Sequence, residues 1–148
     1  MKRILNIALA AMLAAAPVAM PAAAQGIPKG GMIERVNALR AQNGLGPVAP
    51  HRQLEKAALA HARDMSAKGY FDHTSPDGSS VGDRVKRAGY RWCSVGENIA
   101  LGQTSIPEAF DAWVTSPGHR ANMLGQFSQI GIARAPNNNW VMVLAAPC

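Results

Sequence analysis

This sequence lacks three features that mark familiar classes of protein. They are a large set of cysteines, a basic pattern typical of nucleic-acid binding, and a zinc-protease motif. Its 148 residues include only two cysteines, so at most one disulfide bond can form. Lys and Arg form no run and do not alternate with aromatic residues, which gives nucleic-acid binding little support. The H-E-x-x-H motif is absent, so the chain carries no dedicated zinc-protease motif.

Long apolar runs are also scarce, and the one such run stands at the start of the chain. Two basic residues precede it, residues 4–16 are apolar apart from Asn6, and residues 22–24 offer a small-x-small cleavage site. This pattern is typical of a secretory signal peptide over residues 1–24, and the run is too short to span a bilayer with ease. An uncleaved anchor is the alternative. We therefore expect an exported protein, periplasmic or secreted, with no transmembrane segment after signal removal.

Removal of residues 1–24 would leave a basic chain of 124 residues. Two of the 15 Lys and Arg residues are lost with the signal peptide, so 13 remain against nine acidic residues, a formal charge of +4. A chain of this length forms one domain and buries about two thirds of its unfolded surface. We expect residues 25–31 to be a flexible lead-in rich in Gly and Pro, and residues 32–148 to form one domain, a monomer.

The two cysteines predict one disulfide bond. In an exported protein two cysteines usually pair, and a Cys93–Cys148 bond would stabilise the domain by roughly 4 kcal/mol in the chain-entropy model. A Cys-His nucleophile pair is the functional alternative. It is less favoured, because the terminal Cys148 gives Cys93 an obvious partner.

The order of helical and strand patterns favours an α+β fold. Apolar spacing predicts helices over 32–41 and 52–68, a short helix capped by Ser79 or Ser80, a helix over 105–114 and a restart at 116–124. Strands are predicted over 94–101, 127–135 and 140–146, with 45–50 as a loop. Because the strands are apolar on both faces, we expect a three-layer α-β-α sandwich: a three-stranded antiparallel sheet flanked by four or five helices.

The strand over 94–101 carries a charge on its apolar face. Successive strand side chains point to opposite faces, so Val95, Glu97 and Ile99 lie together. A lone carboxylate buried there would be strongly destabilising, so Glu97 should be protonated, paired or bound to another group. Arg84 is a candidate partner for a nearby carboxylate.

Two of the four histidines are candidates to meet Glu97. His73 precedes a tight turn, and His119 follows a Ser-Pro-Gly segment, so both stand on rigid supports. We expect His51 to be exposed, and His61, on the apolar stripe of its helix, to be a packed core residue. Two imidazoles and a carboxylate can hold zinc with an open position, but a purely structural hydrogen-bond network explains the same residues equally well.

The segment Gly78-Ser79-Ser80-Val81-Gly82 matches the nucleophile-elbow pattern G-x-S-x-G. A Pro-Asp-Gly turn precedes it instead of the hydrophobic strand that such an elbow requires. The serines therefore indicate a helix cap and not a nucleophile.

An ordered set of motifs resembles one known family. The motifs are His61-Ala62-x2-Met65, Phe71-x-His73, Ser75-Pro76-x-Gly78, Asp83-Arg84, Gly89-Tyr90, Gly96-Glu97-Asn98-Ile99-Ala100, Trp113-x2-Ser116-Pro117-Gly118-His119-Arg120-x-Asn122-Met123-Leu124 and Ile130-Gly131. Together they resemble the bacterial branch of the CAP superfamily (cysteine-rich secretory proteins, antigen 5 and pathogenesis-related 1 proteins). The resemblance covers about residues 33–146.

This resemblance implies an α-β-α sandwich with a central cavity lined by two histidines and two acidic residues. His73 and Glu97 match the first histidine and glutamate, and His119 is the counterpart of the second histidine. Ser116 stands where the second glutamate would be. The implied ligand site is therefore His73, Glu97, His119 and Ser116, and zinc or another divalent metal would be held by His73 and His119.

The resemblance and the residues together favour a secreted binding module. Its ligand would be a small molecule, a lipid or sterol, a cell-envelope polymer fragment or a divalent metal. A metal-dependent hydrolase or protease is the first alternative. A purely structural or interaction domain, in which the polar residues only fix the core, is the second. No cofactor follows with certainty from the residues, and no nucleic-acid partner is expected.

Overall fold

The structure, a computed structural model, describes residues 31–148. The predicted signal peptide and all but the last residue of the lead-in lie outside the described residues. The helices are α1 (Met32–Gln42), α2 (Arg52–Lys68), α3 (Val81–Arg87), α4 (Ile106–Thr115) and α5 (Pro117–Met123). The strands are β1 (Ala49–Pro50), β2 (Trp92–Leu101), β3 (Gln129–Ala135) and β4 (Asn139–Pro147), with the short 3-10 turn η2 (Pro136–Asn138) joining the last two.

The sheet has four strands and mixed pairing, in the order β1-β3-β4-β2. β4 pairs antiparallel with β2 and β3, as the sequence predicted for the three long strands. The prediction of a three-stranded, wholly antiparallel sheet was wrong, because β1 adds a fourth strand parallel to β3, with Ala49 opposite Gln129. β1 is only two residues long, which is too short for apolar alternation to be visible in the sequence.

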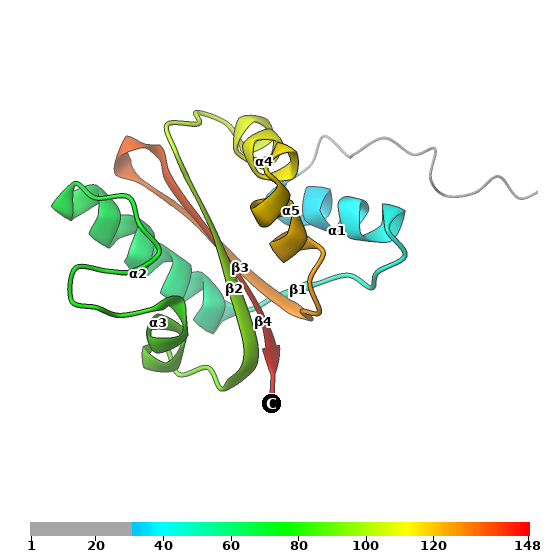
Figure 1. Cartoon of the computed structure of the whole chain (residues 1–148), viewed down its shortest axis with the longest axis horizontal. Coiled ribbons are helices and arrows are strands. Elements are labelled where there is room, and N and C mark those ends of the chain that lie inside the picture. Colours follow the sequence, from blue (N-terminus) through cyan, green and yellow to red (C-terminus); the bar gives the residue numbers. More distant parts are fainter. Residues whose placement is uncertain (1–30) are drawn as a thin grey trace, which may run out of the picture.

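Helices cover both faces of the sheet (Figure 1). α2 and α3 lie on one face, and α1, α4 and α5 lie on the other. β4 separates the two apolar clusters by simple alternation: Trp140, Met142 and Leu144 pack toward α1, α4 and α5, whereas Val141 and Val143 pack toward α2 and α3. The predicted α+β arrangement with helices on both faces is therefore confirmed, with five helices.

α2 lies directly against the sheet because of a single glycine. A Cβ added at Gly131 of β3 would come within 2.1 Å of the Glu55 backbone nitrogen and 2.2 Å of the Leu54 carbonyl carbon. Only a residue without a side chain permits this close approach. The contact sets the depth at which α2 carries His61 over the sheet.

On the opposite face, a buried arginine joins α1 to the loop after α5. Arg40 is 4% exposed. Its guanidinium donates hydrogen bonds to the carbonyl oxygens of Gly46 (2.8 Å), Met123 (2.9 Å), Gly125 (2.9 Å) and Phe127 (3.1 Å). Every one of these acceptors is a main-chain carbonyl, so Arg40 fixes the path of two loops without a carboxylate partner.

The start of β2 is joined covalently to the carboxyl end of the chain. Cys93 and Cys148 form the predicted disulfide bond. The G-x-S-x-G segment proves to be a helix start, as expected, because Ser80 is the N-cap of α3 and forms a reciprocal capping box with Asp83. Both features fix the elements that flank Glu97.

Candidate functional site

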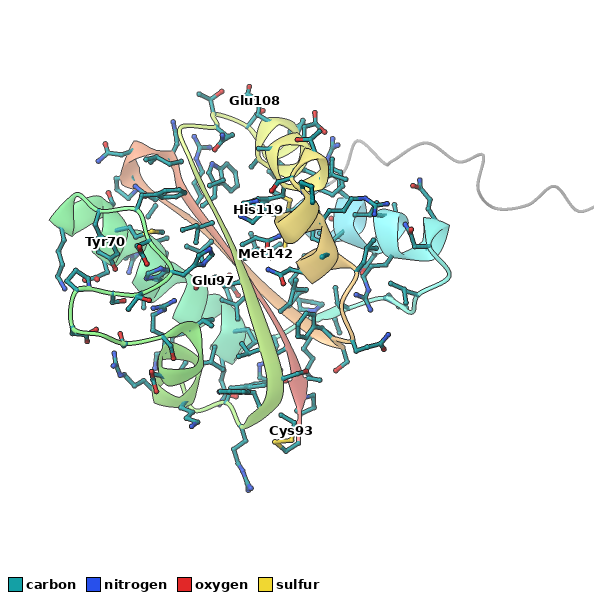
Figure 2. The ribbon with its side chains drawn as sticks, viewed as in Figure 1. Tyr70, Cys93, Glu97, Glu108, His119 and Met142 are labelled. Atoms are coloured by element: carbon teal, nitrogen blue, oxygen red, sulfur yellow. A yellow bond between two sulfur atoms is a disulfide. The ribbon has the colours of Figure 1, made fainter. Side chains whose placement is uncertain are left out.

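The candidate site is built around Glu97, near the middle of edge strand β2. The side chain points toward α2 and α3 and the residue is 5% exposed, which confirms the prediction of an inward-facing carboxylate. Figure 2 shows Glu97 on this side of β2, with Tyr70 beyond it, whereas His119 lies on the α5 side. The cost of burying this charge has to be offset by the groups that contact it.

Arg84 of α3 is the principal partner of this carboxylate. Its Nη2 atom lies 2.9 Å from Oε2 and 3.1 Å from Oε1 of Glu97. The same guanidinium donates to the carbonyl oxygens of His73 and Ser79, at 2.9 Å each, and to the hydroxyl of Ser75 at 3.1 Å. The sequence suggested that Arg84 pairs with a carboxylate, and the structure identifies that carboxylate as Glu97.

His73 is the second partner, as predicted. Its Nδ1 atom lies 2.9 Å from Oε1 of Glu97, and its side chain is 54% exposed. The hydrogen bond to Glu97 raises the pKa of His73, and burial opposes this shift in part. The residue therefore combines an anchored ring nitrogen, held by a buried carboxylate, with a second ring nitrogen directed away from that bond.

His61 of α2 also lies beside Glu97, and the sequence did not predict this contact. It is 1% exposed, and its Nε2 atom lies 3.0 Å from the carbonyl oxygen of Asp72 and 3.8 Å from Oε1 of Glu97. Because both neighbours of Nε2 are acceptors, the ring hydrogen belongs on this nitrogen. Burial lowers the pKa of His61, which keeps the ring neutral.

His61 was correctly predicted to be a packed core residue. Its position on the apolar stripe of α2 also places it near Glu97. That stripe faces the same side of the sheet as Glu97. Its Nδ1 atom lies 3.4 Å from the hydroxyl of Tyr70, which in turn donates to Asp64 at 2.7 Å. These polar groups lie between Asp64 and Glu97 but do not form a continuous hydrogen-bond chain. Tyr70 gives its one hydroxyl hydrogen to Asp64, and Nε2 of His61 lies 3.8 Å from Glu97.

His119 does not meet Glu97. Within residues 31–148 no hydrogen bond or ion pair joins its ring to that carboxylate, so the expectation that both predicted imidazoles would contact Glu97 was wrong. The reason is strand alternation: α5 covers the face to which Asn98 points, and Asn98 donates to the carbonyl oxygen of His119 at 2.9 Å. The imidazole of His61 takes the place expected for His119.

His119 nevertheless has a ring atom in need of a partner. Its Nδ1 atom is buried and has no hydrogen-bond partner among residues 31–148. Burial lowers the pKa of His119, and the charge of neighbouring His73 lowers it further. The electrostatic effect on His119 therefore links this residue to His73.

Ser116 lies between two helices. It ends α4 and begins α5, and as the N-cap of α5 its side chain makes no capping hydrogen bond. α4 is fixed on the edge strand by Trp113, whose indole donates to the carbonyl oxygen of Ile99 at 3.0 Å. Ser116 therefore stands at the junction of α4 and α5, with a hydroxyl where the resemblance calls for a carboxylate.

The donor set fits a metal only in part. No group of three or more His, Cys, Asp or Glu side chains in the described part of the chain is arranged to hold a metal ion. Both oxygens of Glu97 lie within hydrogen-bonding distance of Arg84, which leaves the carboxylate poorly placed as a ligand. The unpartnered Nδ1 of His119 and the outer nitrogen of His73 are the two imidazole donors that remain.

Comparison with known proteins gives a consistent family. Residues 33–145 match the Cysteine-rich secretory protein family, CAP. The protein YkwD of Bacillus subtilis is 42% identical over 102 residues, which cover 68% of this chain and 40% of YkwD. The membrane protein YlbC of the same organism is 28% identical over 102 residues, covering 68% of this chain and 30% of YlbC. The chain thus spans less than half the length of these relatives.

Solved structures give the same fold. An extracellular protein of Bacillus anthracis that contains an SCP domain aligns with a TM-score of 0.74 and 30% identity, over 77% of this chain and 38% of that one. An outer surface protein of Borrelia burgdorferi aligns with a TM-score of 0.73 and 20% identity, over 79% and 90% of the two chains, which shows the fold alone. In residues 31–148 no helix has the length and apolar character needed to cross a membrane. The chain belongs to the cysteine-rich secretory protein (CAP) family.

Proposed function

We propose that this chain is an exported CAP domain that binds its ligand at His73 and His119, across the edge strand β2. The observation that carries this proposal is the buried Nδ1 atom of His119, which has no hydrogen-bond partner in the described part of the chain. A buried polar atom without a hydrogen bond costs free energy of roughly 1–3 kcal/mol, so a ligand that satisfies it gains that much. The neighbouring His73 offers the second contact.

The network behind His73 orients it for this role. Arg84 fixes the carboxylate of Glu97, and the carboxylate holds Nδ1 of His73. An imidazole bound in this way presents its other nitrogen in one orientation, as the outer-sphere carboxylates of histidine ligands do. Glu97 would thus act as a positioning residue and not as a base, because Arg84 already occupies its oxygens.

A divalent metal such as zinc is one ligand that this pair could hold. His73 and His119 would be its protein ligands. A metal bound by them would act as a Lewis acid at the protein surface. Ser116 would contribute a hydroxyl in place of a carboxylate, which predicts weak binding. The other ligand classes are lipids or sterols and cell-envelope polymers, which the basic balance of the chain favours when they are anionic.

Export is supported by the pattern at the start of the chain and by two similar structures. Residues 1–24 have the features of a secretory signal peptide. The aligned proteins of Bacillus anthracis and Borrelia burgdorferi are named extracellular and outer-surface proteins. The proposed location is outside the cytoplasm, in the periplasm or the medium, with the domain as a monomer.

The test is a titration of the purified chain with zinc, with lipid vesicles and with cell-wall fragments, followed by calorimetry and by imidazole NMR. For whichever probe binds, His73→Ala and His119→Ala should each weaken binding at least about tenfold. His51→Asn is the matched control, because His51 caps α2 away from the site and Asn preserves the cap. Binding that is unchanged in both site variants, or no binding of any probe, would leave the cluster with a purely structural role.

A further inference from the structure

A pocket of about 250 Å³ lies between α2, α3 and the turn that connects them. Both helices lie on the same face of the sheet (Figure 1). The pocket exists because the facing walls are made of alanines, Ala57 and Ala60 on α2 and Ala88 after α3, whose small side chains do not fill the gap. Its volume equals about eight times the share of one water molecule in the liquid, more than a bare inorganic ion needs.

Cations outnumber anions around this pocket. Four basic side chains line it, and the two acidic ones are already engaged: Lys56, Lys68, Arg84 and Arg87 against Asp64 and Asp77. Asp64 accepts from Tyr70 at 2.7 Å and pairs with Lys68 at 2.7 Å, and Asp77 accepts from the Ser79 backbone at 2.9 Å. An incoming cation would therefore find both carboxylates occupied.

Two of the four lining cations, Lys56 and Arg87, are available to receive an anion. Lys56 has no ion-pair partner within residues 31–148. Arg87 is held only loosely, 3.6 Å from Asp77, with its side chain 61% exposed. His61, which lines the inner wall, is kept neutral by burial and adds no charge.

The inner wall of the pocket contains a buried arginine. The side chain of Arg84 is 6% exposed, and all its hydrogen bonds run through Nη1 and Nη2. Its Nε atom has no acceptor among the described residues. Arg84 lines the pocket, and a guanidinium N–H without an acceptor can bind an oxyanion.

We propose that this pocket binds a small oxyanion, a phosphate or carboxylate group carried on a molecule of about monosaccharide size. Arg84 and Lys56 would contact the anionic group, and the alanine walls would accommodate the attached carbon skeleton. This site differs from the His73–His119 pair in position and chemistry, so either proposal can fail alone. Arg84 is shared by the two sites, because it binds Glu97 through Nη2 and is also one of the residues that line the pocket.

The test uses four probes on the purified full chain: inorganic phosphate, glucose 6-phosphate, glucuronate and neutral glucose. Binding is followed by calorimetry and by the imidazole NMR signal of His61, which lines the pocket. The signal of His51, outside the pocket, is the internal control. We expect the phosphate or carboxylate sugars to shift the His61 signal and neutral glucose not to shift it. The comparison of glucose 6-phosphate with glucuronate identifies the preferred anion.

A pair of charge variants separates a built site from general attraction. Lys56→Gln removes a lining cation of α2, whereas Arg63→Gln removes an exposed cation of the same helix that does not line the pocket. Lys56→Gln should weaken binding about tenfold, and Arg63→Gln should not change it. Equal losses in both variants, or equal binding of glucose and its charged derivatives, would overturn the proposal. Neither substitution touches the core, so both variants should fold.

Discussion

The most deeply buried arginine on each face of the sheet binds a different kind of partner. Arg40, on the face covered by α1, α4 and α5, is 4% exposed and binds four main-chain carbonyl oxygens. Arg84, on the α2–α3 face, is 7% exposed and binds the carboxylate of Glu97 together with two carbonyls and a hydroxyl. Arg40 and Arg84 are the same type of residue and are both buried, so neither property tells their roles apart.

The partner distinguishes the structural arginine from the one that belongs to a site. The carbonyls around Arg40 carry no net charge and do not titrate, so Arg40 can only hold loops in place. The carboxylate bound by Arg84 is shared with His73, so Arg84 influences a half-exposed, titratable side chain. The layer around Arg84 can therefore respond to pH or to a ligand, and the layer around Arg40 cannot do so through its arginine.

The largest expected effect is the loss of Arg84. Arg84→Met leaves Glu97 buried without its main counter-charge, so the free energy of unfolding should fall by about 3–5 kcal/mol, measured by urea denaturation. The double variant Arg84→Met/Glu97→Gln should recover more than half of that loss, because the uncompensated charge is gone. Additive losses in the double variant would show that the pair is not coupled.

Replacing Arg40 should destabilise the protein less than replacing Arg84 does. No single second substitution should restore the lost stability. Only its bond to the carbonyl of Met123 is fully buried, whereas the other three bonds are partly buried. We expect Arg40→Met to lower the free energy of unfolding by about 2–3 kcal/mol in the same urea experiment. Arg40→Lys, which keeps one cationic donor, should give an intermediate value. A loss above that of Arg84→Met would reverse the comparison.

Adding a carboxylate beside α5 would give the Arg40 face an acidic residue near His119. Ser116→Glu restores the acid that the family resemblance places there, and it should strengthen zinc binding about tenfold if His73 and His119 are the ligands. Thr115→Glu, one residue earlier at the exposed end of α4, is the matched control and should leave zinc affinity unchanged. Equal gains in both variants would indicate non-specific attraction of the cation.

The smallest effect is in the titration of His73. Because its pKa is raised in the folded protein, His73 contributes stability that is fully present below its unfolded pKa, about 6.5, and is lost as pH rises through the folded value. Imidazole NMR should show His73 titrating above the ordinary range, and His61 and His119 below it. Glu97→Gln should lower the pKa of His73, and Arg40→Lys should not. An unchanged His73 in Glu97→Gln would exclude Glu97 as the cause.

Local patterns predicted most of the elements, the inward-facing carboxylate of Glu97 and its contact with His73. The alternation along β2 was enough to place Glu97 inward, and the rigid turn after His73 was enough to place that ring beside it. The number of cysteines predicted the Cys93–Cys148 bond. The two-residue strand β1 could not be predicted, because a strand so short has no period and exists only through its pairing with β3.

The choice between His61 and His119 required tertiary information. The alternation of side chains along β2 predicts that Glu97 and Asn98 face opposite sides of the sheet. It does not predict which helix covers which side. α2 covers the face of Glu97, and α5 covers that of Asn98. The partners of Arg40 are invisible for the same reason, because three of its four acceptors are more than 80 residues away in sequence and none is a side chain.

Edge strand β2 also has a consequence for self-association. A ten-residue strand with one free side is a template on which another chain can add. Here the carbonyl of Glu97 accepts from the side-chain amide of Asn122 at 3.0 Å, and that of Ile99 accepts from the indole of Trp113 at 3.0 Å. Side chains of α4 and α5 thus take the positions that an invading strand would need, and the rim of the sheet is protected from aggregation by the same helices that position His119.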